Sequence, residues 1–323
     1  MITSVQLIPL LEPIRPQLER VECLLHETLT KVEEPISSRL RHSLDGGKRL
    51  RPALVILTGQ IFASSTKPFY NLAAAVDMLH TATLIHDDLL DEAPLRRGRE
   101  TLHTIWPAGA TVLAGDYLLG QAISLIAELE HPRVFKVLGE TLCTLCTGEI
   151  RRMVVAGGER SREGYYRSIE AKTASLFAAS TEMAGVLAGA EERQIAVLRR
   201  FGRELGMAFQ VVDDVLDFIG DEAQLGKPAG SDFRQGLMTL PILYYLEMTE
   251  DDGPVHAVLA GQRDEEHVRA AIEAVRSSGA IEASLAEARA HARRSQEALM
   301  TLPDNASRHT LCSLAEYVVE RRW

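Results

Sequence analysis

The chain has 323 residues, of which 46% are hydrophobic and 25% are charged, so it can bury a substantial core. Its formal net charge of -10 argues against nucleic-acid binding and against broad adhesion to anionic lipid. Any binding of phosphate must therefore come from local basic clusters or from metal ions. Aromatic residues make up only 5%, and the abundance of alanine and leucine favours helices.

Apolar residues recur at three- and four-residue spacing along most of the chain, between short Gly or Pro breaks. This pattern predicts helices, and the alternation typical of strands is almost absent. The predicted helical segments are 17–34, 36–44, 52–62, 71–93, 110–130, 132–155, 168–188, 191–219, 235–248, 264–277, 281–299 and 306–322. No low-complexity linker divides them, so we predict one all-α domain over residues 1–323, with the most apolar helices in a central bundle.

Four cysteines are present, and Cys143 and Cys146 have CxxC spacing. No second CxxC completes a zinc site, so we expect these two side chains to pack in the core. The N-terminus lacks the pattern of a signal peptide, and no uninterrupted apolar run approaches the ~20 residues that span a bilayer. We therefore expect a cytoplasmic protein without a transmembrane segment.

Two copies of one acidic pattern stand out, Asp87-Asp88-Leu89-Leu90-Asp91 and Asp213-Asp214-Val215-Leu216-Asp217. We call them the first and the second aspartate motif. Both lie in apolar helical segments, where unpartnered carboxylates are unfavourable. The first and last aspartates of each motif point to nearly the same side of their helix. Carboxylate oxygens suit Mg²⁺, which completes its shell with water and substrate phosphate. The motifs therefore predict a site for Mg²⁺ and a diphosphate.

Four basic clusters accompany the aspartate motifs. Each alone is as well explained by a solvated turn or a surface salt bridge, but their coincidence with two acidic motifs is hard to explain by stability. Glycines permit close backbone approach to a phosphate, and arginine can bind it in a bidentate manner. The clusters contain Lys48 and Arg51; Arg96 and Arg97; Lys172 with Thr173; and Lys227.

Taken together, these residues resemble the trans-isoprenyl diphosphate synthase (polyprenyl synthetase) family, from about residue 40 to the C-terminus. The most specific segments are Gly46–Pro52, His80–Asp91 with Arg96-Arg97-Gly98, and Gly206–Asp217. The resemblance implies an all-helical bundle around a deep central cavity, usually in a homodimer. It also implies Mg²⁺, with three ions when substrate is bound, and transient membrane association for product release.

The resemblance further implies roles for individual residues. An allylic diphosphate would bind through Mg²⁺ held by Asp87, Asp91 and Asp213, supported by Asp88, Asp214 and Asp217. Arg96, Lys172, Gln210 and Lys227 would contact that diphosphate. Isopentenyl diphosphate would be held by Lys48, Arg51, His80 and Arg97. Thr173 would stabilise the developing cation.

The residues one turn before Asp87 bear on product length. Thr83 and Ala82 should line the cavity below the allylic diphosphate, and small side chains there leave room for a long tail. Within the family, Ala82 resembles long-chain synthases, so we predict a product longer than twenty carbons. Geranylgeranyl diphosphate is the alternative, if Leu79 and the facing segment 118–122 close the cavity farther down.

Three other classes of function compete with this prediction. A carboxylate di-iron bundle needs a Glu-x-x-His pair on each of two helices, and Glu128–His131 matches once without a convincing partner. A class I terpene cyclase also uses an aspartate-rich helix and Mg²⁺, but it has no use for a second diphosphate site at Lys48, Arg51 and Arg97. A subunit of a heteromeric synthase is the third alternative. Such subunits tend to lose an aspartate motif or the basic set, and this chain keeps both.

Overall fold

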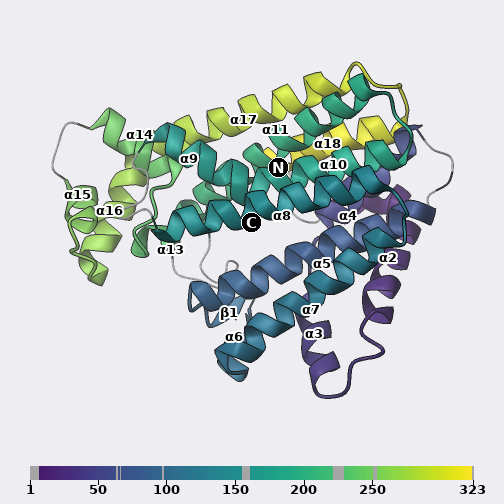
Figure 1. Ribbon diagram of the computed structural model, residues 1–323. Helices are drawn as coiled ribbons and strands as arrows, with labels where there is room; N and C mark the ends of the chain where they lie inside the picture. Colours follow the sequence, from purple (N-terminus) through teal and green to yellow (C-terminus); the bar gives the residue numbers. More distant parts are fainter. Residues whose placement is uncertain are drawn as a thin grey trace.

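The computed structural model describes residues 7–62, 65, 67–96, 98–154, 161–220, 229–249 and 253–321, and these are almost wholly helical (Figure 1). The predicted all-α class is confirmed, while a single domain over the whole chain stays a prediction. The first elements are α1 (Leu7–Leu11), η2 (Glu12–Ile14), α2 (Arg15–Glu27), α3 (Ile36–Leu44), α4 (Leu50–Phe62), α5 (Lys67–Leu90), β1 (Leu95–Arg96), β2 (Arg99–Glu100), α6 (Leu102–Ile105), α7 (Ala108–Ala127) and α8 (Pro132–Val154). The others are α9 (Arg162–Ile169), η3 (Glu170–Ala174), α10 (Ser175–Leu187), α11 (Glu192–Ile219), α13 (Ser231–Arg234), α14 (Leu240–Met248), α15 (Pro254–Leu259), α16 (Glu265–Ser277), α17 (Ala280–Leu299) and α18 (Ala306–Glu320).

One predicted helix proves to be interrupted. The sequence predicts a single helix over 168–188, but the structure has α9, then a π-helical turn at η3, then α10. Apolar spacing cannot reveal this difference, because the π-turn widens the helix locally without breaking its run of apolar residues. Single π-turns within helices occur frequently at functional sites, and η3 contains Lys172 and Thr173.

The long helices pack in two pairs with a central helix between them (Figure 1). Helix α5 packs along α7, and α11 packs along α17. Helix α10 contacts α4, α5, α8 and α11, so it joins the two pairs through the main apolar core. Helices α13 to α16 gather at one end of the molecule around a smaller apolar cluster. The aspartate motifs lie near the C-terminal ends of α5 and α11, on opposite sides of the space that this packing leaves.

The outer faces of α7 and α8 are more apolar than expected. Cys143 and Cys146 are exposed on α8, so the expectation that they pack in the core is wrong. Helix α7 is long and apolar enough to cross a membrane by length and composition alone, although less than half of its apolar window is buried in the structure. The sequence predicted this helix over 110–130, but its apolar run is interrupted at Asp116 and was therefore not read as a membrane span.

A buried ionic cluster fastens α11 to α17. Glu204 is only 6% exposed, and its carboxylate accepts hydrogen bonds from Arg203 (2.7 Å), His291 (2.7 Å) and Arg294 (2.9 Å). Burial opposes ionisation of Glu204, but the hydrogen bonds from His291 and Arg294 outweigh it and lower its pKa to about 2. The cluster therefore stabilises the fold as long as Glu204 is ionised.

We expect Glu204→Gln to lower the free energy of unfolding at pH 7 by about 3 kcal/mol, because a pKa lowered in the folded state stabilises the protein above the unfolded pKa. The difference from wild type should be full above about pH 4.5 and should vanish as the pH falls towards 2. Urea unfolding at several pH values measures it. Glu192→Gln on the same helix, where the carboxylate pairs with Arg133 at the surface, is the control and should change little.

Candidate active site

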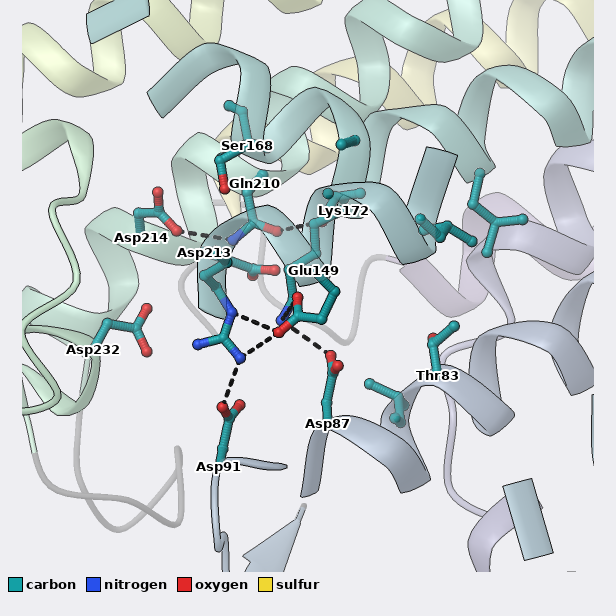
Figure 2. A pocket seen from close by; sticks show the side chains of 18 of the residues that line it. Thr83, Asp87, Asp91, Glu149, Ser168, Lys172, Gln210, Asp213, Asp214 and Asp232 are labelled. Carbon is teal, nitrogen blue, oxygen red and sulfur yellow. Dashed lines mark hydrogen bonds and ion pairs between the residues drawn. The ribbon is translucent and has the colours of Figure 1, made fainter. Parts of the chain in front are cut away.

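A cavity of about 2000 Å³ opens between α5, α8, η3 and α11 (Figure 2). Both aspartate motifs reach it: Asp87 and Asp91 line it from α5, and Asp213, Asp214 and Asp217 line it from α11. The helix turn of about 100° per residue explains why the first and last aspartates of a motif share one face. Two motifs that lie far apart in the sequence therefore meet around one space.

Each outer aspartate of the first motif is paired with a cation from another element. Lys172 Nζ lies 3.0 Å from Asp87 Oδ2, and Arg152 Nη2 of α8 lies 3.0 Å from Asp91 Oδ1. Burial raises the pKa of Asp87, and Lys172 only partly opposes this effect. Burial would lower the pKa of Lys172, but Asp87 and Glu149 raise it overall, so the ammonium stays charged.

Asp88 points away from this cavity. It is 6% exposed, lines a separate small cavity and accepts a hydrogen bond of 2.6 Å from Arg96 Nε. Burial raises its pKa, and the contact with Arg96 lowers it in part. One residue after Asp87, it lies about 100° around the helix and does not line the main cavity, and its supporting role at the metal site stays a prediction. Its position suits holding Arg96, which borders both cavities.

The second motif is held by the C-terminal part of the chain. Arg321, which follows α18, donates from Nη2 to Asp213 Oδ1 at 2.6 Å and to the Phe209 carbonyl at 2.8 Å. Asp217 is 3% exposed, and its Oδ2 accepts the backbone N–H of Asp232 at 3.1 Å. Only Asp213 of this motif is substantially open, with 39% of its side chain exposed. It is therefore the aspartate of α11 best placed to meet a ligand.

Four side chains connect the π-turn to the second motif. Thr173 Oγ1 donates to Gln210 Oε1 at 2.6 Å, and Gln210 Nε2 donates to Asp214 Oδ1 at 2.8 Å. Tyr165 of α9 donates its hydroxyl to Asp214 Oδ2 at 2.6 Å. Burial and the nearby Asp232 raise the pKa of Asp214, whereas Tyr165 and Gln210 oppose that rise. Both oxygens of Asp214 thus have donors, which fixes the carboxylate's orientation.

The π-turn that carries Lys172 is also anchored from behind. Arg203 of α11 binds Glu170 with both ends of its guanidinium, at 2.6 and 2.8 Å. The same guanidinium contacts Glu204, the centre of the buried ionic cluster. A bidentate pair of this kind restricts the geometry as well as adding energy. The position of Lys172 therefore depends on the packing of α11 against α17.

The other predicted basic residues gather in the same cavity. Lys48, Arg51 and His80 all line it, and Arg51 lies over the Phe177 ring at 4.6 Å. Arg49 between them has a positive φ of 50° and is buried, and it bonds Glu22 of α2 (2.7 Å) and Asp77 of α5. This buried anchor holds the loop so that Lys48 and Arg51 reach the cavity.

The residues predicted to set product length divide into two groups. Thr83 lines the cavity four positions before Asp87. Ala82 (2% exposed) and Leu79 (1% exposed) belong to the apolar core and do not line this cavity. Five positions before Asp87, Ala82 lies about 140° around the helix, so it faces the neighbouring helices instead. Thr83 therefore lines the cavity as predicted, and Ala82 does not. Leu79, which was predicted only as part of a floor farther down, lies in the core.

Some predicted residues lie outside the described part of the chain, and some cavity residues were missed. Arg97 and Lys227 are outside the described residues. The residues that the sequence reasoning did not assign are Glu149, Arg152, Tyr165, Asp232 and Arg321, all of which line the cavity. Glu149 and Arg152 are three positions apart and so share a helix face, and this spacing is the sequence pattern that could have identified them. Tyr165 and Arg321 had no local signal, because only tertiary packing brings them to the second motif.

The donor set fits Mg²⁺. Within the described ranges, no three His, Cys, Asp or Glu side chains converge tightly enough to form a metal cage. Mg²⁺ needs only one or two carboxylates and takes its other ligands from water and phosphate. Asp87 and Asp91 from one side and Asp213 from the other provide that chemistry (Figure 2). Lys172 and Arg152 contact Asp87 and Asp91, respectively. The fold and the site define a helical enzyme that handles metal-bound diphosphates.

Comparison with known proteins identifies this class more closely. The family model for Polyprenyl synthetase matches residues 33–275. Component 2 of the heptaprenyl diphosphate synthase of Geobacillus stearothermophilus is 37% identical over 94% of this chain and 99% of its own length. The nonaprenyl diphosphate synthase of Mycobacterium tuberculosis is 35% identical over 95% of this chain and 93% of its own. A crystal structure of a polyprenyl synthase from Caulobacter crescentus, complexed with calcium and isoprenyl diphosphate, superposes with a TM-score of 0.91 at 34% identity and covers 99% of this chain and 98% of its own.

The chain therefore belongs to the polyprenyl synthetase family, and the resemblance drawn from its sequence is confirmed. The relatives that it resembles over nearly its whole length are named polyprenyl diphosphate synthases, which are prenyltransferases. The roles of its individual site residues remain predictions.

Tyr165→Phe should lower kcat about tenfold, because a buried carboxylate oxygen of Asp214 loses its donor. Steady-state kinetics measures this effect, and a thermal melt confirms that the variant folds. Tyr166→Phe is the control: this neighbouring ring lies outside the cavity lining and should keep activity within about twofold of wild type. Full activity of Tyr165→Phe would show that Asp214 does not need this hydrogen bond.

Proposed function

We propose that the chain alone catalyses the condensation of isopentenyl diphosphate with an allylic diphosphate, giving a trans-polyprenyl diphosphate longer than twenty carbons. One observation carries this proposal: both aspartate motifs and two separate basic sets border a single cavity. One set is Lys172 with Arg96, beside the first motif, and the other is Lys48 with Arg51 and His80. Two basic sets suit two diphosphates, whereas a terpene cyclase needs only one.

The chemistry follows from the charges. Ionisation of an allylic diphosphate leaves a carbocation and a pyrophosphate that gains negative charge as the bond breaks. Bound Mg²⁺ would neutralise part of that charge, held by Asp87 and Asp91 on one side and by Asp213 on the other. Lys172 is already aimed at this region by the π-turn, so little reorganisation is needed when charge develops. Thr173 and its partner Gln210 both line the cavity, and their oxygens would stabilise the cation.

The basic set at Lys48, Arg51 and His80 would hold isopentenyl diphosphate with its double bond towards that cation. Proton loss after the new C–C bond forms needs no protein base, because the departing pyrophosphate can accept the proton. We therefore assign no residue of the cavity as a general base. Small Thr83 below Asp87 leaves room for an elongating tail, which supports the long product.

Incubation of the purified chain with farnesyl diphosphate and isopentenyl diphosphate, followed by chromatography of the dephosphorylated products, tests the proposal. We expect Mg²⁺-dependent products longer than twenty carbons. A product that stops at twenty carbons would replace the proposal with a geranylgeranyl diphosphate synthase. No consumption of isopentenyl diphosphate by the chain alone would favour a subunit of a heteromeric synthase, the arrangement that the name of the Geobacillus relative describes.

We also propose that the chain forms a homodimer through α7 and α8. Their surfaces expose Val112 (40%), Leu113 (67%) and Phe135 (47%), which is costly in water unless another surface covers them. Light scattering should give twice the chain's 35.6 kDa. Leu113→Asp should shift the mass towards one chain, while Met300→Asp at the end of α17 should not. A monomeric wild type would leave this face to a different partner.

We further propose that the enzyme works in the cytoplasm with transient membrane contact for product release.

A further inference from the structure

Arg152 lines the cavity, but none of the roles proposed above uses it. It lies on α8 and has 22% of its side chain exposed. Its guanidinium spans two carboxylates from different helices: Nη2 lies 3.0 Å from Asp91 Oδ1, and Nε lies 2.6 Å from Glu149 Oε1. The contact with Asp91 joins residues 61 positions apart, so local helix geometry does not produce it.

Arg152 belongs to a row of alternating charges along the first motif. Glu149 also lies 3.6 Å from Lys172 Nζ, which in turn contacts Asp87 at 3.0 Å. The row therefore runs Asp91, Arg152, Glu149, Lys172 and Asp87, with a cation on each metal-facing aspartate (Figure 2). Glu149 lies between the two cations and holds both in place. Arg152 is thus placed at Asp91 as Lys172 is at Asp87.

A metal ion bound at Asp91 would compete with this arrangement, because its positive charge repels the Arg152 guanidinium. Asp91 Oδ1 cannot accept the hydrogen bond from Arg152 and coordinate Mg²⁺ with the same lone pairs. Once the carboxylate turns to the metal, the guanidinium keeps Glu149 on one edge and has its other edge open to the cavity. A planar guanidinium matches the oxygens of a phosphate in a bidentate manner, so the diphosphate is its natural replacement partner.

We propose that Arg152 is a diphosphate-binding residue of the first motif, which occupies Asp91 in the free enzyme and transfers to the diphosphate when the metal arrives. The proposal rests on the proposed binding of an allylic diphosphate at this motif and adds a ligand to it. Two opposite effects follow for Arg152→Gln. Loss of the competing cation strengthens metal binding when no diphosphate is present, and loss of the phosphate contact weakens diphosphate binding when metal is saturating.

Calorimetric titrations of the full chain test both effects with simple probes. With Mn²⁺ alone, Arg152→Gln should bind at least threefold more tightly than wild type. With saturating Mg²⁺ and inorganic pyrophosphate, it should bind about tenfold more weakly, the loss expected for a charge-assisted hydrogen bond. Arg133→Gln is the matched control: it makes the same charge change on the same helix, at a surface pair with Glu192. It should leave both titrations unchanged.

The outcomes separate this proposal from the function on which it rests. Pyrophosphate affinity within twofold of wild type for Arg152→Gln overturns the proposal, provided that Asp91→Asn weakens pyrophosphate binding. If Asp91→Asn also binds normally, the proposed function of the first motif fails instead. Should Arg152→Gln not fold, Arg152→Lys decides, because it keeps the charge but loses the planar fork. We expect it to bind pyrophosphate at least threefold more weakly, and wild-type affinity would overturn the proposal.

Discussion

The pairing of Asp87, Asp91 and Asp213 with cations from other elements is the interaction on which the site depends. Carboxylates gathered around one cavity repel one another, and burial deprives them of solvation, so they need partners of opposite charge. Lys172, Arg152 and Arg321 solve the problem at Asp87, Asp91 and Asp213, respectively. The same cations keep the cavity prepared for a ligand that carries its own metal and its own negative charge.

The contacts that hold these cations in place extend beyond the cavity wall. Lys172 is set by a π-turn, the turn is held by Arg203, and Arg203 is held by the buried ionic cluster around Glu204. At the second motif, Tyr165 and Gln210 donate hydrogen bonds to Asp214 and not to Asp213. The charged network behind the site therefore stabilises the fold and orients the reactive groups with the same contacts. This explains why an enzyme of this class would retain buried ions that apolar side chains could replace.

Local pattern predicted much of this architecture, and tertiary packing determined the rest. Helices such as 36–44 follow directly from apolar spacing and helix breakers. The two DDxxD motifs indicate metal binding through their residue types alone. The π-turn, the orientation of Ala82 away from the cavity and the approach of Arg321 to Asp213 do not follow from spacing. Each depends on how far one helix rotates or reaches relative to another. The small strand pair after the first motif, Leu95 with Glu100 and Arg96 with Arg99, is likewise too short for any sequence pattern.

If the proposed function is right, both aspartate motifs bind the same metal-bound diphosphate. The decisive measurement is how Mg²⁺ changes the affinity for inorganic pyrophosphate in wild type, in Asp87→Asn and in Asp213→Asn. We expect Mg²⁺ to strengthen binding in wild type and either substitution to remove most of this gain, because metal ions held by both helices would contact one ligand. If either variant retained the full Mg²⁺-dependent gain, the two motifs would not share a ligand, and the proposed function of the site would be wrong.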